Sequence, residues 1–232
     1  MTLTDADLEV LKQWDTPTIC NGLEVVSPER RALGFTTEQL HCFDPALAPM
    51  VGYARTATIR AVTPATEPAD VMREQRARYY EYVASGASPT VVIIQDLDPN
   101  PGFGAFWGEV NTAVHKGLGA LGVVTNGSIR DLDECAPGFQ LLAGKIGPSH
   151  AHVHVVGFGE TVDVYGLVAE HDDVIHADRH GAVVIPREVV KALPAAIDLL
   201  TRREAVILGA ARGEGFDIEV LKRAMADSAE IH

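Results

Sequence analysis

The sequence has few cysteines, and those it has are not arranged in pairs. Three cysteines, Cys20, Cys42 and Cys135, occur among 232 residues, and no C-x-x-C motif is present. An odd, sparse set of this kind argues against a disulfide framework and predicts free thiols in a reducing compartment.

The sequence is also short of positive charge. Lys and Arg total 19 against 32 Asp and Glu, which gives a formal net charge of −13. Nucleic acids and anionic membrane surfaces both require a basic footprint, so neither is an expected partner. An anionic small molecule would need a local basic site, because the overall field of the protein repels it.

Long apolar runs are missing as well. No apolar stretch approaches the roughly 18 residues of a membrane span, and the first ten residues, MTLTDADLEV, are too acidic and polar for a signal peptide. We therefore expect a cytoplasmic protein. The composition, 47% hydrophobic and 22% charged, is typical of a globular chain long enough to bury a sizeable core.

Helical and strand patterns alternate in the middle of the chain, and strand patterns follow one another after residue 150. Helices are expected at 4–14, 69–86 and 110–122, and in a long region from Arg187, while residues 15–26 predict a turn followed by a short helix. Strands are expected at 51–62, 90–98, 122–127, 151–159 and 161–169, with a strand–turn–strand at 172–186. The mixture predicts a single α/β domain with more than one sheet.

A glycine-rich loop at 101–109 lies between a predicted buried strand and a predicted helix. Free backbone N–H groups at a helix start favour an anion, and Glu109 stands at that start. The loop matches neither G-x-G-x-x-G nor the Walker A pattern, so nucleotide binding is weakly supported. An ordinary strand-to-helix connection explains the loop equally well.

The stretch VVTNGSIRDLDE, residues 123–134, places a cation beside a carboxylate just after a predicted strand and an Asn126-Gly127 turn. Arg130 offers a planar fork for a carboxylate or an enolate oxygen, and Asp131 offers a hard oxygen for Mg²⁺ or Mn²⁺. The alternative is a solvated helix start. Asp133 and Glu134 fit that alternative, because acids stabilise a first helical turn.

Several histidines are also candidates. His150, His152 and His154 alternate and would share one face of a strand, but a spacing of about 6–7 Å is too wide for one Zn²⁺ or Cu²⁺ ion. We expect packing or a subunit contact instead. His176 and His180 flank Asp178 in a segment that predicts a strand, a turn at Gly181 and another strand.

Residues 108–134, GEVNTAVHKGLGALGVVTNGSIRDLDE, resemble the core motif of the RraA-like family, which includes class II 4-hydroxy-4-methyl-2-oxoglutarate aldolases. In that family a G-E/D acid precedes a helix and a D-G-x-x-R-D motif, and here the R-D pair follows the acid by 21 to 22 residues. GLVAEHDDVIHADRHGAVVIP, LKQWDTPTICNGLE and VGYARTATIR are similar to other family segments. The resemblance covers most of residues 10 to 190.

The resemblance implies an α-β-β-α layered fold of the swivelling β/β/α type, one domain over residues 1–232. The N-terminal helix and the C-terminal helical region would be extensions that contact other subunits. The family implies a homotrimer or homohexamer with active sites at the subunit interfaces.

The resemblance also implies roles for individual residues. Asp131 matches the ligand of the divalent metal, Mg²⁺ or Mn²⁺, and Arg130 matches the arginine that holds the pyruvyl carbonyl oxygen and its enolate. Glu109 matches an acid that orients a metal-bound water. The amides of Gly108, Glu109, Val110 and Asn111 match those that receive the substrate carboxylate. A further acid comes from a neighbouring subunit, and Glu204 is its placement here.

Two departures from the family pattern stand out. Asn126 replaces the Asp of the family's D-G, which removes a negative charge that we expect beside the site, and the family's P-G-D is His171-Asp172-Asp173 here. The ribonuclease E regulator branch of the family does not retain the metal-binding Asp. The presence of Asp131 therefore favours an enzyme over a regulator.

The function expected from the resemblance is a divalent-metal-dependent lyase that cleaves a carbon–carbon bond of a 2-oxo acid through a pyruvate enolate. The reaction would be retro-aldol cleavage of a 4-hydroxy-4-methyl-2-oxoglutarate type of substrate, oxaloacetate decarboxylation, or both. The alternatives are a non-catalytic regulatory or binding protein, and a lyase or hydrolase acting on another oxo acid or on a ring-cleavage product.

Overall fold

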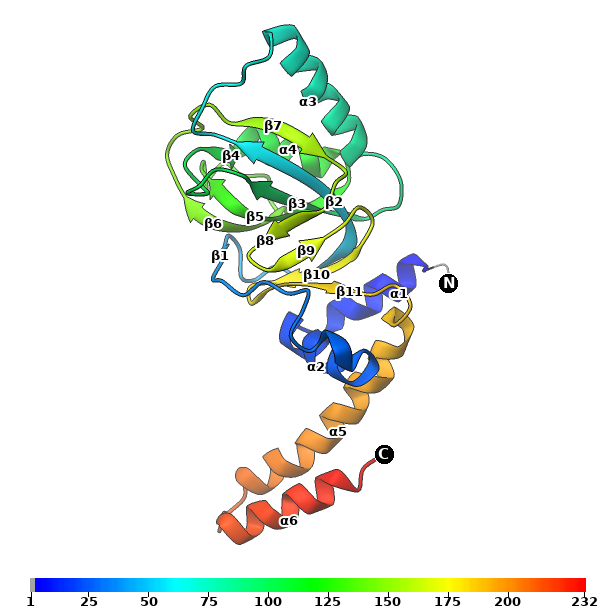
Figure 1. The fold of residues 1–232 in the computed structure, drawn as a ribbon. Coiled ribbons are helices and arrows are strands. Elements are labelled where there is room, and N and C mark those ends of the chain that lie inside the picture. Colours follow the sequence, from blue (N-terminus) through cyan, green and yellow to red (C-terminus); the bar gives the residue numbers. More distant parts are fainter. Residues whose placement is uncertain (1–2) are drawn as a thin grey trace.

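A curled, mixed sheet of nine strands forms the body of the computed structural model, which describes residues 3–232 (Figure 1). The strand order is β1-β6-β5-β3-β2-β10-β11, with β4 beside β5 and β7 beside β2; β8 and β9 form a separate hairpin. The strands are β1 (His41–Cys42), β2 (Met50–Arg60), β3 (Thr90–Asp96), β4 (Ala105–Trp107), β5 (Ala120–Ile129), β6 (Gln140–Ile146), β7 (His154–Phe158), β8 (Val162–Val164), β9 (Leu167–Ala169), β10 (Val174–Asp178) and β11 (Gly181–Ile185). The mixed α/β fold agrees with the expected class.

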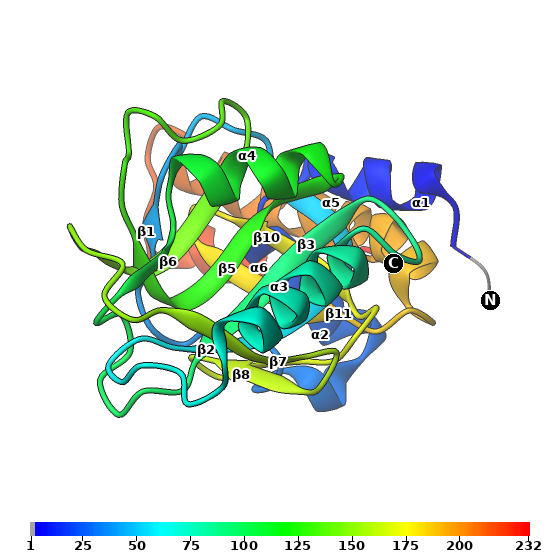
Figure 2. The same cartoon turned by 90° about the horizontal axis from the view of Figure 1, so that it is seen from above.

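Two βαβ units build the centre of the sheet. Helix α3 (Ala69–Val83) connects β2 to β3, and α4 (Glu109–Gly117) connects β4 to β5; β2, β3, β5 and β6 are mutually parallel. Seen from above, α3 and α4 lie on the same face of the sheet (Figure 2). The opposite face packs against the β8–β9 hairpin, so a separate apolar cluster fills each side. Burial on both faces explains why residues 91–94 are continuously apolar.

The remaining helices lie at the β10–β11 end of the sheet. Helices α1 (Asp5–Glu9) and α2 (Thr16–Val26) pack against that end with the 3₁₀ turn η1 (Val10–Gln13), forming a third apolar cluster. The segment from residue 187 continues through the 3₁₀ turn η3 (Val190–Ala192) into α5 (Leu193–Ala211) and α6 (Ile218–Ala229).

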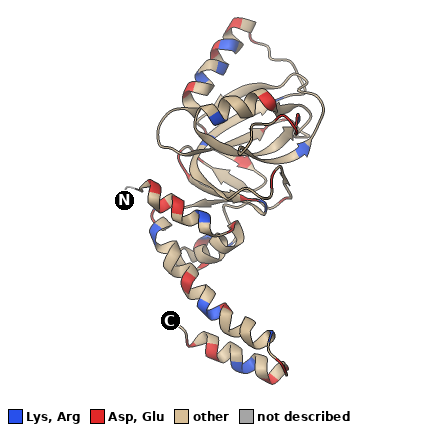
Figure 3. Ribbon diagram, turned by 180° about the vertical axis from the view of Figure 1, so that it is seen from behind, with Lys and Arg blue, Asp and Glu red and all other residues tan. Residues whose placement is uncertain are grey.

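Helices α5 and α6 form an antiparallel hairpin that projects away from the sheet (Figure 1). Acidic and basic residues both occur along α3 and along this arm (Figure 3). The arm also exposes large apolar side chains, namely Leu208, Phe216, Ile218 and Met225. Among residues 3–232, no helix combines the length and the apolarity that crossing a membrane requires.

The turn predicted at Asn126-Gly127 is wrong, because β5 continues through these residues to Ile129. The pairing of β5 with β6 shifts register between Thr125 and Ser128, so Asn126-Gly127 marks an irregularity inside the strand. The Asn126 side chain bridges to β3: its Oδ1 accepts from Asp96 N at 2.7 Å and its Nδ2 donates to Asp96 O at 3.1 Å.

The helix start considered after Arg130 is also wrong. Asp131 adopts a left-handed backbone conformation, with φ 52°, and residues 132–134 form a turn in which Glu134 N donates to Asp131 O at 3.1 Å. Asp133 is therefore a turn residue. The chain then reaches β6, the adjacent parallel strand, through residues 130–139, which form a loop and not a helix.

The three alternating histidines do not share a strand. Only His154 belongs to β7, whereas His150 and His152 lie in a turn in which Val153 N donates to His150 O and Ala151 has φ 45°. The strand–turn–strand predicted at 172–186 is confirmed as β10 and β11. Gly181 is the first residue of β11, and its φ of 126° suits glycine.

Candidate active site

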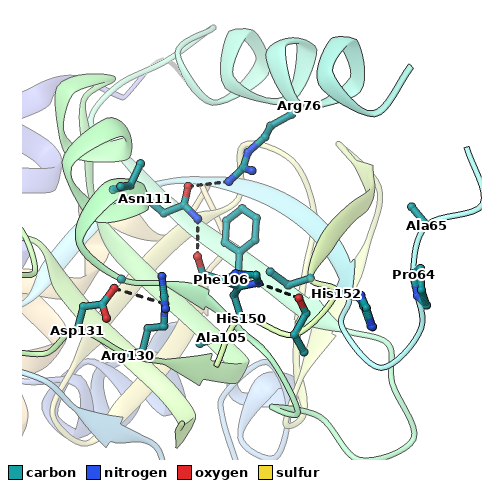
Figure 4. Close-up of a pocket in the computed structure, with 14 residues that line it drawn as sticks. Pro64, Ala65, Arg76, Ala105, Phe106, Asn111, Arg130, Asp131, His150 and His152 are labelled. Carbon is teal, nitrogen blue, oxygen red and sulfur yellow. Dashed lines mark hydrogen bonds and ion pairs between the residues drawn. The ribbon is translucent and has the colours of Figure 1, made fainter. Parts of the chain in front are cut away.

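A cavity of about 440 Å³ opens where the end of β4, the start of α4 and the corner after β5 meet the 150–153 turn (Figure 4). The structure brings five of the predicted site residues to this cavity: Gly108, Val110, Asn111, Arg130 and Asp131. The remaining lining residues are Pro64, Ala65, Arg76, Ala105, Phe106, His150, Ala151, His152 and Val153. The junction between β4 and α4 and the junction between β5 and the loop that follows it therefore lie at one edge of the sheet.

The corner that carries Arg130 and Asp131 is held against β4. Arg130 N donates to Trp107 O at 2.9 Å, and the left-handed conformation of Asp131 turns the chain immediately afterwards. Adjacent residues on a regular strand would point to opposite faces, but this turn lets both side chains reach one cavity. Arg130 Nε lies 3.4 Å from Asp131 Oδ2, and each side chain remains about one-third exposed, at 36% and 34%.

Gly108 allows the Asp131 carboxylate to lie directly against the start of α4. A Cβ at Gly108 would stand 2.6 Å from Asp131 Oδ2 and 3.2 Å from Arg130 Cγ. Thr112 N makes the first intrahelical bond, to Gly108 O, so the N–H groups of the preceding helical residues have no helical acceptor. These amides and the Arg130 guanidinium make this end of the cavity suitable for an anion.

Asn111 lies at the centre of a hydrogen-bond network that the sequence did not predict. Its Oδ1 accepts from Arg76 Nη2 at 3.2 Å and from Tyr80 Oη at 3.0 Å, while its Nδ2 donates to Phe106 O. Only 7% of Asn111 is exposed. Arg76 brings a second guanidinium to the cavity from α3, a segment whose sequence shows only a charged amphipathic helix.

A buried histidine joins α3 and α4 beneath this network. Tyr79 Oη lies 2.8 Å from His115 Nε2, and His115 Nδ1 lies 2.6 Å from Asn111 O. Burial lowers the pKa of His115 to about 4, so its imidazole is neutral near pH 7. In that state Nδ1–H donates to Asn111 and Nε2 accepts from Tyr79, which fixes the position of Asn111 relative to α3.

Two buried carboxylates position the loop that leads to β4. Asp96 Oδ2 accepts from Gly102 N at 2.7 Å, and Asp98 Oδ2 accepts from Ala61 N at 2.7 Å. Burial raises the pKa of Asp96 above its ordinary value. Asn126 bonds the backbone of Asp96 and does not line the cavity. The loss of a negative charge that we expected beside the site, through Asn126 in place of Asp, therefore lies within the sheet instead.

Two predicted residues lie outside the cavity lining. Glu109 is the first residue of α4, and its side chain is exposed. Glu204 lies on α5, in the arm that extends away from the sheet, so it does not reach the cavity of its own chain (Figure 1). Its placement at the cavity of a neighbouring subunit remains a prediction.

The histidines separate into two groups. His150 and His152 line the cavity, whereas His176 and Asp178 join the N-terminal helices to β10: Thr16 N donates to Asp178 Oδ2 at 3.0 Å, and Thr16 Oγ1 lies 3.0 Å from His176 Nδ1. This second group has a structural role.

The carboxylate of Asp131 suits a hard divalent ion. Mg²⁺ retains several waters and is commonly held by one or two protein carboxylates together with its substrate, so Asp131 alone is an adequate protein donor. In the described part of the chain, no group of three His, Cys, Asp or Glu side chains is arranged to hold a metal. A zinc site made of three protein ligands is therefore not formed within residues 3–232.

The fold and the cavity define a mixed α/β protein in which an arginine–aspartate pair faces the start of a helix. The sequence profile of the RraA-like family (Aldolase/RraA) matches residues 10–184. The chain belongs to this family, as the sequence motifs indicate. A search of curated proteins finds no match.

Solved structures share the fold at low sequence identity. An uncharacterised protein from Pseudomonas syringae pv. tomato has a TM-score of 0.73 at 17% identity, over 98% of this chain and 96% of that one. Streptomyces coelicolor RraAS2, described as an unusual member of the RNase ES inhibitor RraA family, has a TM-score of 0.68 at 21% identity, over 88% and 97%. The RNA-processing inhibitor RraA from Thermus thermophilis gives 0.52 at 17%, over 71% and 90%.

Proposed function

We propose that this protein is a divalent-metal-dependent lyase that cleaves a carbon–carbon bond of a 2-oxo acid through a pyruvate enolate. The observation that carries the proposal is the Arg130–Asp131 pair, 3.4 Å apart, placed against the start of α4 in one cavity. This arrangement offers a metal ligand, an oxyanion donor and a carboxylate receptor side by side. The chain belongs to the RraA-like family, which includes aldolases, and this supports the proposal.

Each part of the cavity has a distinct task in this proposal. The free N–H groups at residues 109–111 receive the substrate carboxylate, and the Arg130 guanidinium donates to the keto oxygen. Asp131 holds Mg²⁺ or Mn²⁺, which when bound supplies a Lewis acid for the 2-oxo acid group. Because Arg130 retains its charge throughout, it stabilises the oxygen most strongly when that oxygen becomes anionic in the transition state.

The bond between C3 and C4 of the substrate breaks, and its electron pair remains on the pyruvyl fragment as the enolate. In retro-aldol cleavage the C4 hydroxyl gives up its proton to water as C4 becomes the carbonyl carbon of the leaving ketone or keto acid, whereas in decarboxylation C4 leaves as CO₂. Protonation of the enolate at C3 then gives pyruvate. Glu109, between the lining residues Gly108 and Val110 in the sequence, carries an exposed carboxylate that can exchange protons with solvent.

The direct test is pyruvate release from 4-hydroxy-4-methyl-2-oxoglutarate and from oxaloacetate, with Mg²⁺ or Mn²⁺ and after EDTA treatment. We expect EDTA to abolish release, Mg²⁺ or Mn²⁺ to restore it, and Asp131→Ala to prevent that restoration. Undiminished activity in the variant or after chelation would falsify the mechanism. A panel of other 2-oxo acids in the same assay identifies the substrate if neither compound is cleaved.

A regulatory protein is the second candidate, because the fold is shared with RraA proteins described as inhibitors of RNA processing. Asp131 favours the enzyme, since a protein that acts only by binding a partner does not need a metal ligand in a cavity. Absence of turnover across the 2-oxo acid panel, together with a stable complex with a ribonuclease, would support the regulator.

We also propose that the protein is a homotrimer or homohexamer, with Glu204 of one subunit completing the cavity of the next. The projecting arm and its exposed apolar side chains provide a surface for such an assembly. Mixing inactive Asp131→Asn and Glu204→Gln subunits tests the shared site. Activity regained on mixing supports it, because some interfaces then combine both wild-type residues. No recovery after confirmed subunit exchange excludes it.

A further inference from the structure

Arg76 is a charged side chain in the cavity lining that the proposed reaction does not use. It reaches the cavity from α3, whereas Arg130 and Asp131 come from the corner after β5. Figure 4 shows Arg76 at one end, Arg130 and Asp131 at the other, and Asn111 and Phe106 between them. The two guanidinium groups therefore face the same space from opposite ends.

The Arg76 guanidinium is held in place by neutral groups. Its Nε donates to Tyr80 Oη at 3.0 Å and its Nη2 donates to Asn111 Oδ1 at 3.2 Å. Its Cζ lies 5.8 Å from the ring centroids of both Tyr80 and Phe106, within the range of a cation–π contact. These contacts fix the orientation of the group without neutralising its charge.

Arg76 also has no carboxylate partner within residues 3–232, although the chain carries a net charge of −13. Among the described residues that line the cavity, Asp131 is the only carboxylate, and it is already beside Arg130. Arg76 Nη1 makes no hydrogen bond to any residue from 3 to 232, so its N–H groups remain available to a ligand. An oriented, unneutralised guanidinium is suited to a planar anion.

We propose that Arg76 binds a second carboxylate of the substrate and makes the site selective for dicarboxylic 2-oxo acids over monocarboxylic ones. The inference rests on the proposed function for the placement of the 2-oxo acid group at Arg130. A second hollow of about 190 Å³, lined by Met72, Val153 and His154 among others, adjoins the cavity at Arg76 and Phe106. Arg76 thus lies at the outer end of the main cavity, where the distal group of the substrate arrives.

The test compares two ligands that differ only in the distal group, 2-oxoglutarate and 2-oxopentanoate. Their dissociation constants are measured by calorimetry in the presence of Mg²⁺, so the test does not depend on turnover. We expect the wild-type protein to bind 2-oxoglutarate more tightly, by on the order of 10- to 100-fold, the range for a hydrogen bond to a charged group. Arg76→Gln should abolish most of this preference with little effect on 2-oxopentanoate, and Arg76→Lys should retain part of it.

Two further variants separate the effect of the positive charge on α3 from the effect of the hydrogen bonds that orient Arg76. Arg78→Gln removes one positive charge from the same helix at an exposed position outside the cavity, and it should leave the preference unchanged. Tyr80→Phe removes the acceptor of Arg76 Nε and one donor to Asn111, but it keeps the charge and the bond from Arg76 Nη2 to Asn111, so part of the preference should remain. If Arg78→Gln lowers the preference as far as Arg76→Gln does, the charge of the helix is responsible and the inference is wrong.

Deuterium exchange at C3 of pyruvate distinguishes this inference from the proposed function. Exchange requires enolate formation but no distal carboxylate, so in the wild-type protein it tests the lyase proposal and not the contact from Arg76. If the wild-type protein fails to exchange deuterium yet prefers 2-oxoglutarate, the lyase proposal fails and the role of Arg76 in binding the second carboxylate remains. If exchange occurs and Arg76→Gln weakens the binding of both ligands equally, or of neither, that role of Arg76 is refuted.

Discussion

Gly108 offers a way to disturb the candidate site without disturbing the fold. Its φ of −175° is extended backbone that any residue adopts, so a side chain at this position introduces no backbone strain. In Gly108→Ala, however, the new Cβ would stand 2.6 Å from Asp131 Oδ2, whereas ordinary contact begins at 3.4 Å. The carboxylate must therefore move by about 0.8 Å, away from the helix start and out of its position beside Arg130.

The size of the expected effect follows from this displacement. Misplacing a reacting group by about 1 Å costs on the order of 100-fold in rate, so kcat/KM for pyruvate release should fall by about that factor. Stability should change little. Alanine is a poorer N-cap than glycine by about 1 kcal/mol, but it also restricts the unfolded chain by a similar amount.

The assay pairs initial rates of pyruvate formation with thermal unfolding of the same preparations. Gly117→Ala, at the other end of α4, is the matched control, because a Cβ there meets nothing within 4 Å. We expect this control to retain wild-type kcat/KM and Mn²⁺ affinity. Wild-type activity in Gly108→Ala, with normal Mn²⁺ binding, would refute the assignment of the Asp131 carboxylate to the reaction.

Three further outcomes follow from the geometry. His115 has a folded-state pKa of about 4, well below its unfolded value, so its stabilising contribution is present above about pH 6.5 and is lost as the pH falls. Urea unfolding should show that the wild-type protein loses more free energy of unfolding between about pH 7.5 and pH 5 than His115→Gln does, by about 2 kcal/mol. An equal loss in the two proteins would contradict the burial of a neutral imidazole. Asn126→Asp removes the donor to Asp96 O and buries a charge, so it should destabilise the fold by about 3 kcal/mol at neutral pH. The loss of stability should be smaller at acid pH, where a protonated carboxyl can donate. If the variant and the wild-type protein are equally stable at pH 7, the role assigned to the amide is wrong. Mn²⁺ titration monitored by calorimetry should show one site per subunit in wild-type protein and none in Asp131→Asn, whereas Asp133→Asn, at the neighbouring turn, should bind normally.

Much of the chain organisation could be predicted from local sequence pattern. Burial on both faces makes β3 continuously apolar, and one buried stripe gives α2 its helical spacing, so both elements were evident. The pattern failed where tertiary contacts override local preference. Asn126-Gly127 favours a hairpin turn in isolation, but here the Asn amide bonds the neighbouring strand and the strand continues.

The candidate site likewise contains residues that the sequence could identify and residues that it could not. The spacing from Glu109 to Arg130 and Asp131 is a property of the sequence, and together with the family motifs it identified the arginine–aspartate pair. Arg76 could not be found by the same route, because it is an exposed arginine on an amphipathic helix and only the tertiary structure shows that it lines the cavity. The histidines at 150 and 152 could not be placed on a turn for a similar reason, since alternation alone predicts a strand.

By itself, the sequence determined the family, the mixed α/β class and the arginine–aspartate pair to which we assign an oxyanion and a metal, because these depend on residue identity and spacing along one chain. Only the tertiary structure decided that the left-handed turn at Asp131 directs both side chains into one cavity and that Gly108 admits the carboxylate. It also placed a second guanidinium opposite the first. These features depend on distances between segments remote in sequence, which local propensities do not encode.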